Sequence, residues 1–238
     1  MADGLSPRGM HQGSQGSMTD LSLRLAFDSQ FAPLTFLEHG RPAGRAIDIV
    51  RRASAKAGIR IAFSPVSSET QVWPAGGATR GLDGFVCMAV TDARTADFRF
   101  SVPYLPGRAA LFWRVDREPI QADRLDGLLV ATPRSGPLFS LLSNRPHGPR
   151  VLPTHSYHES LLLVWQGAAD AAALNAEVGW HLAQEIRRDG FVPMSAPFPE
   201  LLGLAVALLP ESERAEEVLA RLDPALAATL SPPAAPGP

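Results

Sequence analysis

A strand–helix–strand pattern near the start of the chain constrains its fold more than any other feature. The apolar runs Leu23–Phe27 (LRLAF) and Ile59–Phe63 (IRIAF) each have the length of a buried strand. Between them, apolar residues recur on one face of a predicted helix, basic residues lie on the other, and Gly58 ends it. The apolar face consists of Ala46, Ile47, Val50, Ala53 and Ala57. This β-α-β unit predicts an α/β protein.

The same alternation continues to the end of the chain. Further strands are expected at Gly84–Met88, Ala110–Arg114, Leu128–Ala131, Ala169–Leu174 and Leu204–Leu208. Helices are expected at Tyr157–Gln166 and Ala176–Arg188. A last helix is expected near Ser212–Leu222 and has to restart at Pro224, because proline lacks the backbone N–H that continues a helix. The sheets are therefore expected to be mainly parallel.

Parallel sheets bind ligands beyond the carboxyl ends of their strands. In this chain those ends lead into the loops Asp28–Phe36 and Cys87–Arg94. We therefore expect a binding site to be built from these loops.

Composition narrows the classes of function. The formal net charge of −2 argues against a nucleic-acid partner, which requires clustered surplus Lys and Arg. The single cysteine, Cys87, excludes an internal disulfide and a multi-cysteine zinc site. No run approaches the ~20 apolar residues that cross a bilayer. At 238 residues, the chain has room for one large domain or for two lobes.

Both ends of the chain differ in composition from the rest. Residues 1–20 are rich in Gly, Ser, Gln and Met and lack the apolar stretch of a secretory leader, so we expect a flexible tail. Residues 231–238 (SPPAAPGP) are expected to form a Pro-rich tail. Either a leader was removed or the protein stays inside the cell.

Four stretches, taken in order, resemble the family 3 extracellular solute-binding proteins of amino-acid ABC transporters. LRLAFDSQFAPLTF (Leu23–Phe36) and GRAIDIVRRASAKAG (Gly44–Gly58) are similar to the opening strand, aromatic loop and first helix of that family. GLDGFVCMAVTDARTADFRFSVPY (Gly81–Tyr104) resembles its G-x-D, T-x-x-R and F-S-x-P-Y sequence with the internal spacing preserved. HSYHESLLLVWQGAADAAALN (His155–Asn175) resembles a helix and strand that lead to a ligand-contacting acidic residue.

The resemblance implies a two-lobed, type 2 periplasmic-binding-protein fold in which a ligand lies between the lobes. We expect residues 21–106 and 191–230 to form the first lobe and residues 107–190 the second. Binding would favour a closed form that contacts the ligand from both sides.

Three first-lobe residues are the main candidates for ligand contact. The resemblance assigns Arg94 to the α-carboxylate of the ligand, and a planar guanidinium is suited to hold two carboxylate oxygens. Phe31 matches an aromatic residue that lies over the ligand, or it is a core phenylalanine. Asp28 matches a carboxylate that meets the ligand side chain in some members, or it is a loop and capping residue.

Four other positions complete the predicted site. Thr91 donates its hydroxyl or caps the turn that leads to Arg94, and Cys87 and Ala89 stand where the family often has hydroxyl side chains. In the second lobe, Ser135 fits a Gly-Ser turn at a helix start with a one-residue shift, and an ordinary Pro-Gly turn is the alternative.

Asn175 is the most informative departure from the family, because amino-acid binders usually carry there an Asp that receives the α-ammonium. Asn has no charge to offer, which weakens the case for an ordinary α-amino acid. Glu177 compensates for the lost charge or is a surface residue at a helix start.

The sequence offers little support for an enzyme. His155 and His158 have the i, i+3 spacing of two ligands on one helical face but lack a third ligand nearby. No nucleophile elbow, Walker loop, dinucleotide fingerprint or H-E-x-x-H motif occurs, so no cofactor and no metal are expected.

We therefore expect a monomeric, non-enzymatic solute-binding protein that captures a small carboxylate-bearing ligand, an amino acid or a related organic acid. The resemblance implies an ABC permease as partner and the periplasm as location. Two alternatives stay open: a ligand-sensing regulatory module of the same fold without transport, and a lyase like the cyclohexadienyl dehydratases.

Overall fold

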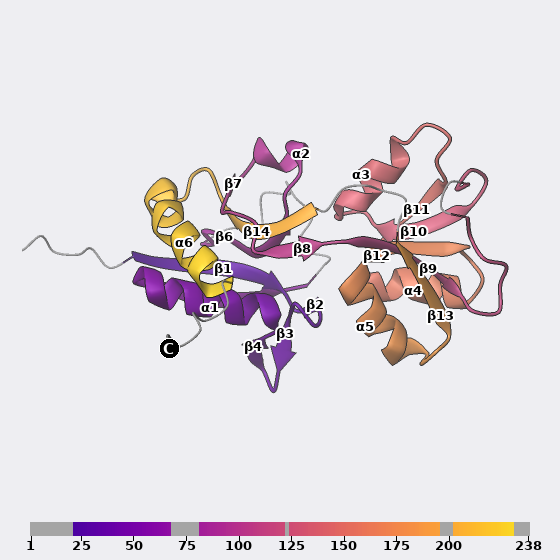
Figure 1. Cartoon of the computed structure of the whole chain (residues 1–238), viewed down its shortest axis with the longest axis horizontal. Helices are drawn as coiled ribbons and strands as arrows, with labels where there is room; N and C mark the ends of the chain where they lie inside the picture. The colour runs from indigo at the N-terminus through magenta and orange to yellow at the C-terminus, as the bar shows by residue number, and fades with distance from the viewer. Residues whose placement is uncertain (1–20, 68–80, 122–123, 196–201, 231–238) are drawn as a thin grey trace, which may run out of the picture.

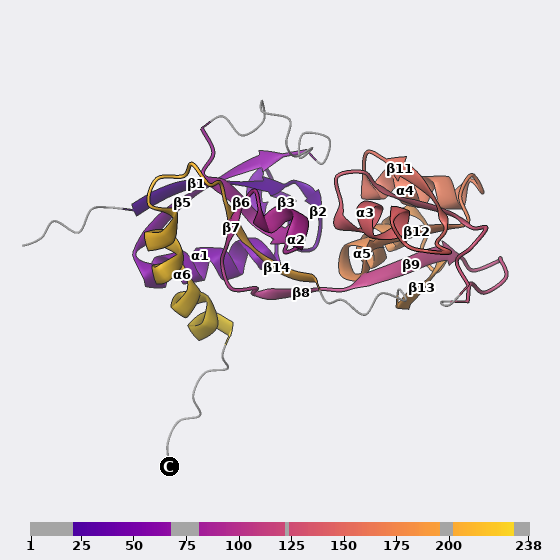
Figure 2. The same cartoon turned by 90° about the horizontal axis from the view of Figure 1, so that it is seen from above.

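Two lobes lie next to each other along the long axis of the protein (Figure 1). The structure is a computed structural model that describes residues 21–67, 81–121, 124–195 and 202–230. Each lobe has its own sheet with helices packed against it, and the view from above shows the same separation (Figure 2). The tails expected at residues 1–20 and 231–238 lie outside the described residues.

The first sheet forms around the predicted β-α-β unit. β1 (Leu21–Asp28) pairs in parallel with β5 (Ile59–Val66) on one side and with β6 (Gly84–Ala89) on the other. α1 (Arg45–Ala57) connects β1 to β5 through the small sheet described below and buries its apolar face. It ends at Gly58, whose left-handed φ of 67° costs glycine nothing sterically. The predicted unit is confirmed.

Strands from later in the chain complete the first sheet through antiparallel pairs with β14. β14 (Leu202–Leu208) pairs with β6, and the short strands β7 (Arg99–Phe100) and β8 (Leu105–Gly107) pair with β14. The described strands follow the order β5-β1-β6-β14-β7. α6 (Ala215–Leu230) packs against α1 and shares its core (Figure 1).

α6 runs through Pro224 without a break. The prediction that the last helix has to restart at this proline is therefore wrong. Pro224 is exposed, whereas Leu222, Ala225 and Leu226 are buried in the first-lobe core on both sides of it. Burial of this apolar face outweighs the hydrogen bond that the proline cannot donate.

The second sheet has a similar arrangement. β10 (Leu129–Pro133) pairs in parallel with β11 (Arg150–Thr154) and β12 (Ala171–Asn175). β9 (Ala109–Arg114) pairs antiparallel with β12, and β13 (Phe191–Ser195) pairs antiparallel with β9. The described strands follow the order β11-β10-β12-β9-β13.

Helices cover both faces of the second sheet. α4 (Tyr157–Trp165) and α5 (Ala176–Ile186) pack on one face, where they meet side chains such as Phe112 and Leu174. α3 (Pro137–Ser143) packs on the other face, against the alternate residues of the same strands. Both faces of the sheet are therefore buried, which explains why β12 reads as a continuous apolar run.

Two features of the architecture differ from the prediction. The sheets are mixed rather than mainly parallel, because one strand next to the crossings in each sheet, β14 in the first and β9 in the second, runs antiparallel to its neighbours. The first crossing is nearly direct, since β8 belongs to the first sheet and β9, which starts two residues later, belongs to the second. β13 pairs in the second sheet, so the chain returns to the first sheet after Ser195 and not after Gly190.

The loop expected at Asp28–Phe36 has strands of its own. β2 (Gln30–Phe31), β3 (Thr35–Glu38) and β4 (Arg41–Ala43) form a small antiparallel sheet at the carboxyl end of β1. α2 (Asp92–Thr95) forms one turn after β6. Both elements lie on the side of the first lobe that faces the second (Figure 1).

We predict that Pro224→Ala stabilises the protein. The substitution restores a backbone donor inside α6 and removes the clash of the proline ring with the preceding turn, without removing buried surface. The free energy of unfolding, measured by urea denaturation, should rise by ~1–2 kcal/mol. Glu216→Gln, an exposed change in the first turn of α6, should stay within about 0.5 kcal/mol of the original protein. A loss of stability in Pro224→Ala would contradict an α6 that is continuous through the proline.

Candidate ligand site between the lobes

The Arg94 guanidinium lies where the two lobes meet. Its Nη1 donates to the carbonyl oxygen of Ala89 in the first lobe at 3.1 Å, and its Nη2 donates to the carbonyl oxygen of Ser135 in the second at 3.0 Å. α2 holds Arg94 in place, because the backbone N–H of Arg94 donates to the Thr91 carbonyl at 2.9 Å. One side chain from the first lobe therefore connects both lobes.

Arg94 is a largely buried cation that has no anionic partner among residues 21–67, 81–121, 124–195 and 202–230. Among the described residues, no carboxylate lies within ion-pair distance of its guanidinium, and its hydrogen bonds to Ala89 and Ser135 both go to neutral carbonyl oxygens. Burial lowers the pKa of Arg94 below its ordinary value. A charge removed from water without a countercharge is costly, so the site favours the arrival of an anion.

Asp28 and Phe31 stand at the edge of the first lobe, as expected for strand and loop ends. Asp28 ends β1, and its Oδ1 accepts a hydrogen bond from the Gln30 backbone N–H at 2.8 Å. Phe31 packs edge-on against Tyr157 of the second lobe, with ring centroids 5.3 Å apart. The Phe31 ring is therefore an interlobe contact as well as part of the first-lobe core.

Cys87, Ala89 and Thr91 line the path from β6 to α2. Burial raises the pKa of the Cys87 thiol to about 12, and a hydrogen bond with Tyr104 opposes this rise, so the thiol is neutral at ordinary pH. Ala89 contributes its carbonyl oxygen to Arg94. Thr91 precedes α2, but its hydroxyl makes no capping hydrogen bond, and its carbonyl oxygen accepts from the backbone instead. The predicted capping role of its side chain is not observed.

The second lobe contributes backbone and amide groups. Ser135 reaches Arg94 through its carbonyl oxygen, in the turn before α3. Asn175 ends β12 and caps α5, because its Oδ1 accepts from the backbone N–H groups of Glu177 and Val178 at 3.1 and 3.2 Å. The structure thus brings Arg94 together with Ser135 and places Asn175 at the second-lobe strand end that leads into α5.

Tyr157 is a residue of the site that the sequence reading missed. It is the first residue of α4, packs against the buried cores of both lobes and contacts Phe31. Burial raises the pKa of its phenol well above the ordinary value, a hydrogen bond from the Asn175 backbone opposes this rise, and the charge of Asp28 adds to it. The phenol is therefore protonated and able to donate.

The capping residues of α4 were the signal that could have located Tyr157. Ser156 Oγ accepts from the Glu159 backbone N–H at 3.1 Å, and Glu159 Oε2 accepts from the His155 backbone N–H at 2.6 Å. This reciprocal pattern fixes the first turn of the helix and with it the position of Tyr157.

A salt bridge joins the lobes beside this site. Arg45 Nη2 lies 2.6 Å from Glu177 Oε2, with the two side chains 48% and 36% exposed. Glu177 is favoured in the first turn of α5, whereas Arg45 starts α1, where the helix dipole disfavours a cation. The ion pair with Glu177 in the other lobe therefore explains why a cation stands at this position. Fully buried Val178, next to Glu177, belongs to the same apolar cluster as the first-lobe core.

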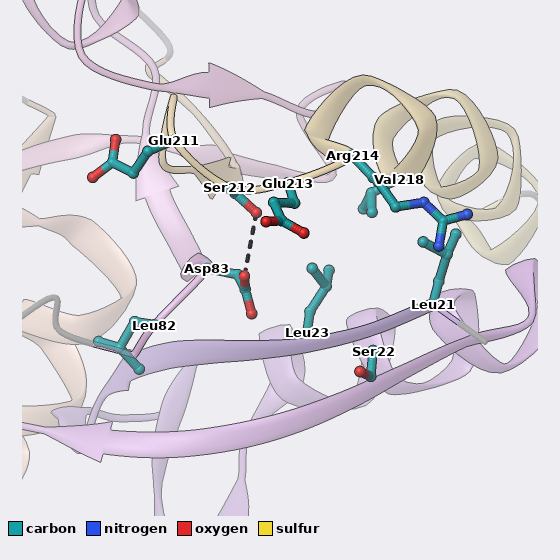
Figure 3. A pocket seen from close by; sticks show the side chains of 10 residues that line it. All are labelled: Leu21, Ser22, Leu23, Leu82, Asp83, Glu211, Ser212, Glu213, Arg214 and Val218. Atoms are coloured by element: carbon teal, nitrogen blue, oxygen red, sulfur yellow. Dashed lines mark hydrogen bonds between the residues drawn. The ribbon is translucent and has the colours of Figure 1, made fainter. Parts of the chain in front are cut away.

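Two hollows in the first lobe lie elsewhere. A polar pocket of about 310 Å³ opens at the amino end of β1, between Leu23 and the turn before α6 (Figure 3). There Ser212 Oγ donates to Asp83 Oδ1 at 3.3 Å. A broader groove of about 1090 Å³ lies between the small sheet and the start of α1. The pocket is at the opposite end of β1 from Asp28, so it is not the site expected at the carboxyl ends of the strands.

In residues 21–67, 81–121, 124–195 and 202–230, no group of three or more His, Cys, Asp and Glu side chains could hold a metal ion. Across the same ranges, none of the helices has both the length and the apolar character needed to cross a bilayer.

Comparisons with solved structures identify the class of fold. A histidine kinase sensor domain with similarity to periplasmic binding proteins superposes with a TM-score of 0.76 at 23% identity, over 87% of this chain and 89% of that one. An ancestral arginine-binding protein bound to glutamine gives 0.73 at 20% identity, over 87% and 91%. The periplasmic VFT2 domain of Bordetella pertussis BvgS gives 0.73 at 22% identity, over 88% and 92%. The chain has the two-lobed periplasmic-binding-protein fold.

The sequence comparisons add the family. Residues 23–231 match the bacterial extracellular solute-binding proteins, family 3, and the chain belongs to that family. It is also 35% identical over 83 residues to the virulence sensor protein BvgS of Bordetella pertussis. That match covers 34% of this chain and 7% of BvgS, so the chain corresponds to a small part of that protein. The predicted family and fold are confirmed.

We predict that the Arg45–Glu177 pair favours the closed arrangement of the lobes. In a double-mutant cycle of Arg45→Gln and Glu177→Gln, the coupling energy in the free energy of unfolding should be about 0.2–1 kcal/mol. It should decrease in ~0.5 M NaCl, because salt screens exposed ion pairs. Small-angle scattering should show a larger radius of gyration in either variant.

The matched control is the Asp48–Arg51 pair, an exposed ion pair of 2.9 Å within α1. Asp48→Asn should leave the radius of gyration unchanged, because this pair does not cross between lobes. Equal scattering from the Arg45, Glu177 and Asp48 variants would show that the interlobe pair has no role in closure.

Proposed function

We propose that this protein binds a small carboxylate-bearing ligand between its lobes, with Arg94 as the residue that holds the carboxylate. The observation that carries the proposal is the buried Arg94 guanidinium, whose hydrogen bonds go to neutral carbonyl oxygens of both lobes. A carboxylate would supply the missing negative charge and accept two parallel hydrogen bonds from one guanidinium. Ligand and Arg94 together would then hold the lobes closed.

Other predicted site residues have roles that are consistent with this proposal. Phe31 and Tyr157 form an aromatic wall across the lobes. Cys87 and Ala89 offer no charged side chain, and Thr91 and Ser135 lie next to the backbone groups that position Arg94. Asp28 is a carboxylate at the first-lobe edge that could meet a distal part of the ligand. With these roles, the ligand would contact both lobes only in the closed form. It would therefore bind the closed form more tightly than the open form, as closure requires.

If Arg94 holds the ligand carboxylate, removal of its charge should weaken ligand binding. At 100 times its dissociation constant a ligand should stabilise the protein by ~2.7 kcal/mol, measured by thermal shift. Arg94→Gln keeps a side-chain donor but removes the charge. We expect it to raise the dissociation constant of a carboxylate ligand by roughly 30-fold or more. Arg52→Gln, on the exposed face of α1, should bind normally. A ligand shift that survives Arg94→Gln unchanged would refute the carboxylate role of Arg94.

The output of binding has two candidates. Delivery to an ABC permease is supported by the family and by structural neighbours such as the substrate-binding protein of an amino-acid ABC transporter. Signalling to a partner, with the same lobes acting as a sensor module, is supported by the 35% identity with part of BvgS and by the similarity to a histidine kinase sensor domain. The sensor relatives are the specific observation that favours signalling as the second candidate.

A genetic experiment separates the two outputs. If the protein signals, deletion of its gene should abolish the transcriptional response to the ligand and leave uptake of the labelled ligand unchanged. Complementation with the Arg94→Gln form should fail to restore the response, whereas the Arg52→Gln form should succeed. Reduced uptake in the deletion strain would instead establish delivery. Formation of product when the purified protein is incubated with prephenate or arogenate would contradict a pure binding function.

A further inference from the structure

The second-lobe side of the site offers hydrogen-bond donors where a cationic ligand group would need acceptors. An amide oxygen has two lone pairs, and Asn175 Oδ1 already accepts from two backbone N–H groups of α5. The remaining amide group of Asn175, Nδ2, can only donate. Toward any ligand that reaches the end of β12, Asn175 is therefore a donor.

Tyr157 can also donate a hydrogen bond to a ligand. Its phenol stays protonated at neutral pH and lies between the Asn175 backbone and the Phe31 ring. Together with the Arg94 guanidinium, the site presents three donor groups, from α2, α4 and the end of β12. An ammonium ion has three N–H donors and no lone pair, and among these groups it could meet only the neutral phenol oxygen, which supplies no countercharge.

The carboxylates nearest to the site are committed elsewhere. Glu177 pairs with Arg45 at 2.6 Å on the partly exposed edge between the lobes. Asp28 Oδ1 accepts from the backbone N–H of Gln30, within the turn that leads from β1 to β2. Neither lies within ion-pair distance of Arg94, whereas the ammonium and carboxylate of an α-amino acid are attached to the same carbon. An α-ammonium next to a carboxylate held by Arg94 would therefore lack a countercharge.

We propose that the site selects carboxylates that carry an oxygen, a 2-oxo or 2-hydroxy group, in place of an α-ammonium group. Asn175 Nδ2 and the Tyr157 hydroxyl would donate to that oxygen while Arg94 holds the carboxylate. This inference rests on the proposed function, because it assumes that the carboxylate is bound by Arg94. In this proposal, Asn175 determines the selectivity for an oxygen over an ammonium on the carbon next to the carboxylate.

Asn175→Asp provides a sharp test because it changes the charge and keeps the helix cap. Asp and Asn are equally good N-cap residues, so α5 should keep its first turn and the unliganded protein should unfold at nearly the same temperature. The new carboxylate would face an α-ammonium favourably and an oxo or hydroxyl oxygen unfavourably.

The experiment measures dissociation constants by calorimetry for matched triplets: alanine, lactate and pyruvate; glutamate, 2-hydroxyglutarate and 2-oxoglutarate; phenylalanine, phenyllactate and phenylpyruvate. In any triplet that binds, we expect the unsubstituted protein to bind the hydroxy or oxo acid at least about tenfold more tightly than the amino acid. In Asn175→Asp that ratio should fall by at least about tenfold. Asp48→Asn, an exposed change on α1, should leave the ratio unchanged. Asp28→Asn tests whether the first-lobe carboxylate receives the ammonium instead.

Results that differ from these expectations contradict either the inference or the proposed function. Equal or tighter binding of the amino acid overturns the inference, and loss of that binding in Asp28→Asn would show that Asp28 receives the ammonium. A preference for oxygen that survives Asn175→Asp overturns the assignment to Asn175. If no triplet shows binding that depends on Arg94, the proposed function fails and the inference fails with it. If amino acids bind and require Arg94, only the inference fails.

Discussion

The contact between Arg94 and two backbone carbonyl oxygens is the interaction on which the arrangement of this protein depends. A first-lobe side chain donates to Ala89 in its own lobe and to Ser135 in the other, so the relative position of the lobes and the position of the guanidinium are linked. Carbonyl oxygens are neutral acceptors, and they leave the positive charge of a largely buried group uncompensated. The guanidinium therefore has hydrogen-bond partners in both lobes but no countercharge from either of them.

Around this contact, the other interlobe interactions divide into an apolar part and an ionic part. The apolar part, Val178 and the Phe31–Tyr157 ring pair, removes surface from water and has little dependence on salt. The ionic part, Arg45–Glu177, lies at an exposed edge where screening limits its strength. An anion at Arg94 would add the one interaction that neither part supplies. Closure can then respond to a ligand, because the lobes already contact each other but the charge of Arg94 is still uncompensated.

The sequence predicted the β-α-β unit, most strands and the position of Arg94, because each depends on local periodicity or on a spaced motif. What it missed depends on contacts between distant segments. Phe191–Ser195 resembles any short strand, and only its pairing with β9 assigns it to the second sheet. Pro224 contradicts a helix locally, yet the buried residues on both sides keep α6 intact. The partners of Arg94 are backbone oxygens, which every residue type carries and which no sequence pattern can single out.

In the proposed site, Asn175 is a position at which one substitution would change the preferred ligand without changing the fold. Its Oδ1 caps α5, and an Asp at the same place would cap the helix equally well. Stability therefore does not distinguish the two residues, and the difference between them appears only in the group presented to a ligand: Nδ2 donors in Asn, a negative charge in Asp. A domain of this family can exchange one residue for the other at little cost to folding. In the proposed site, the residue at the end of β12 would therefore set the preferred ligand and leave the stability of the domain nearly unchanged.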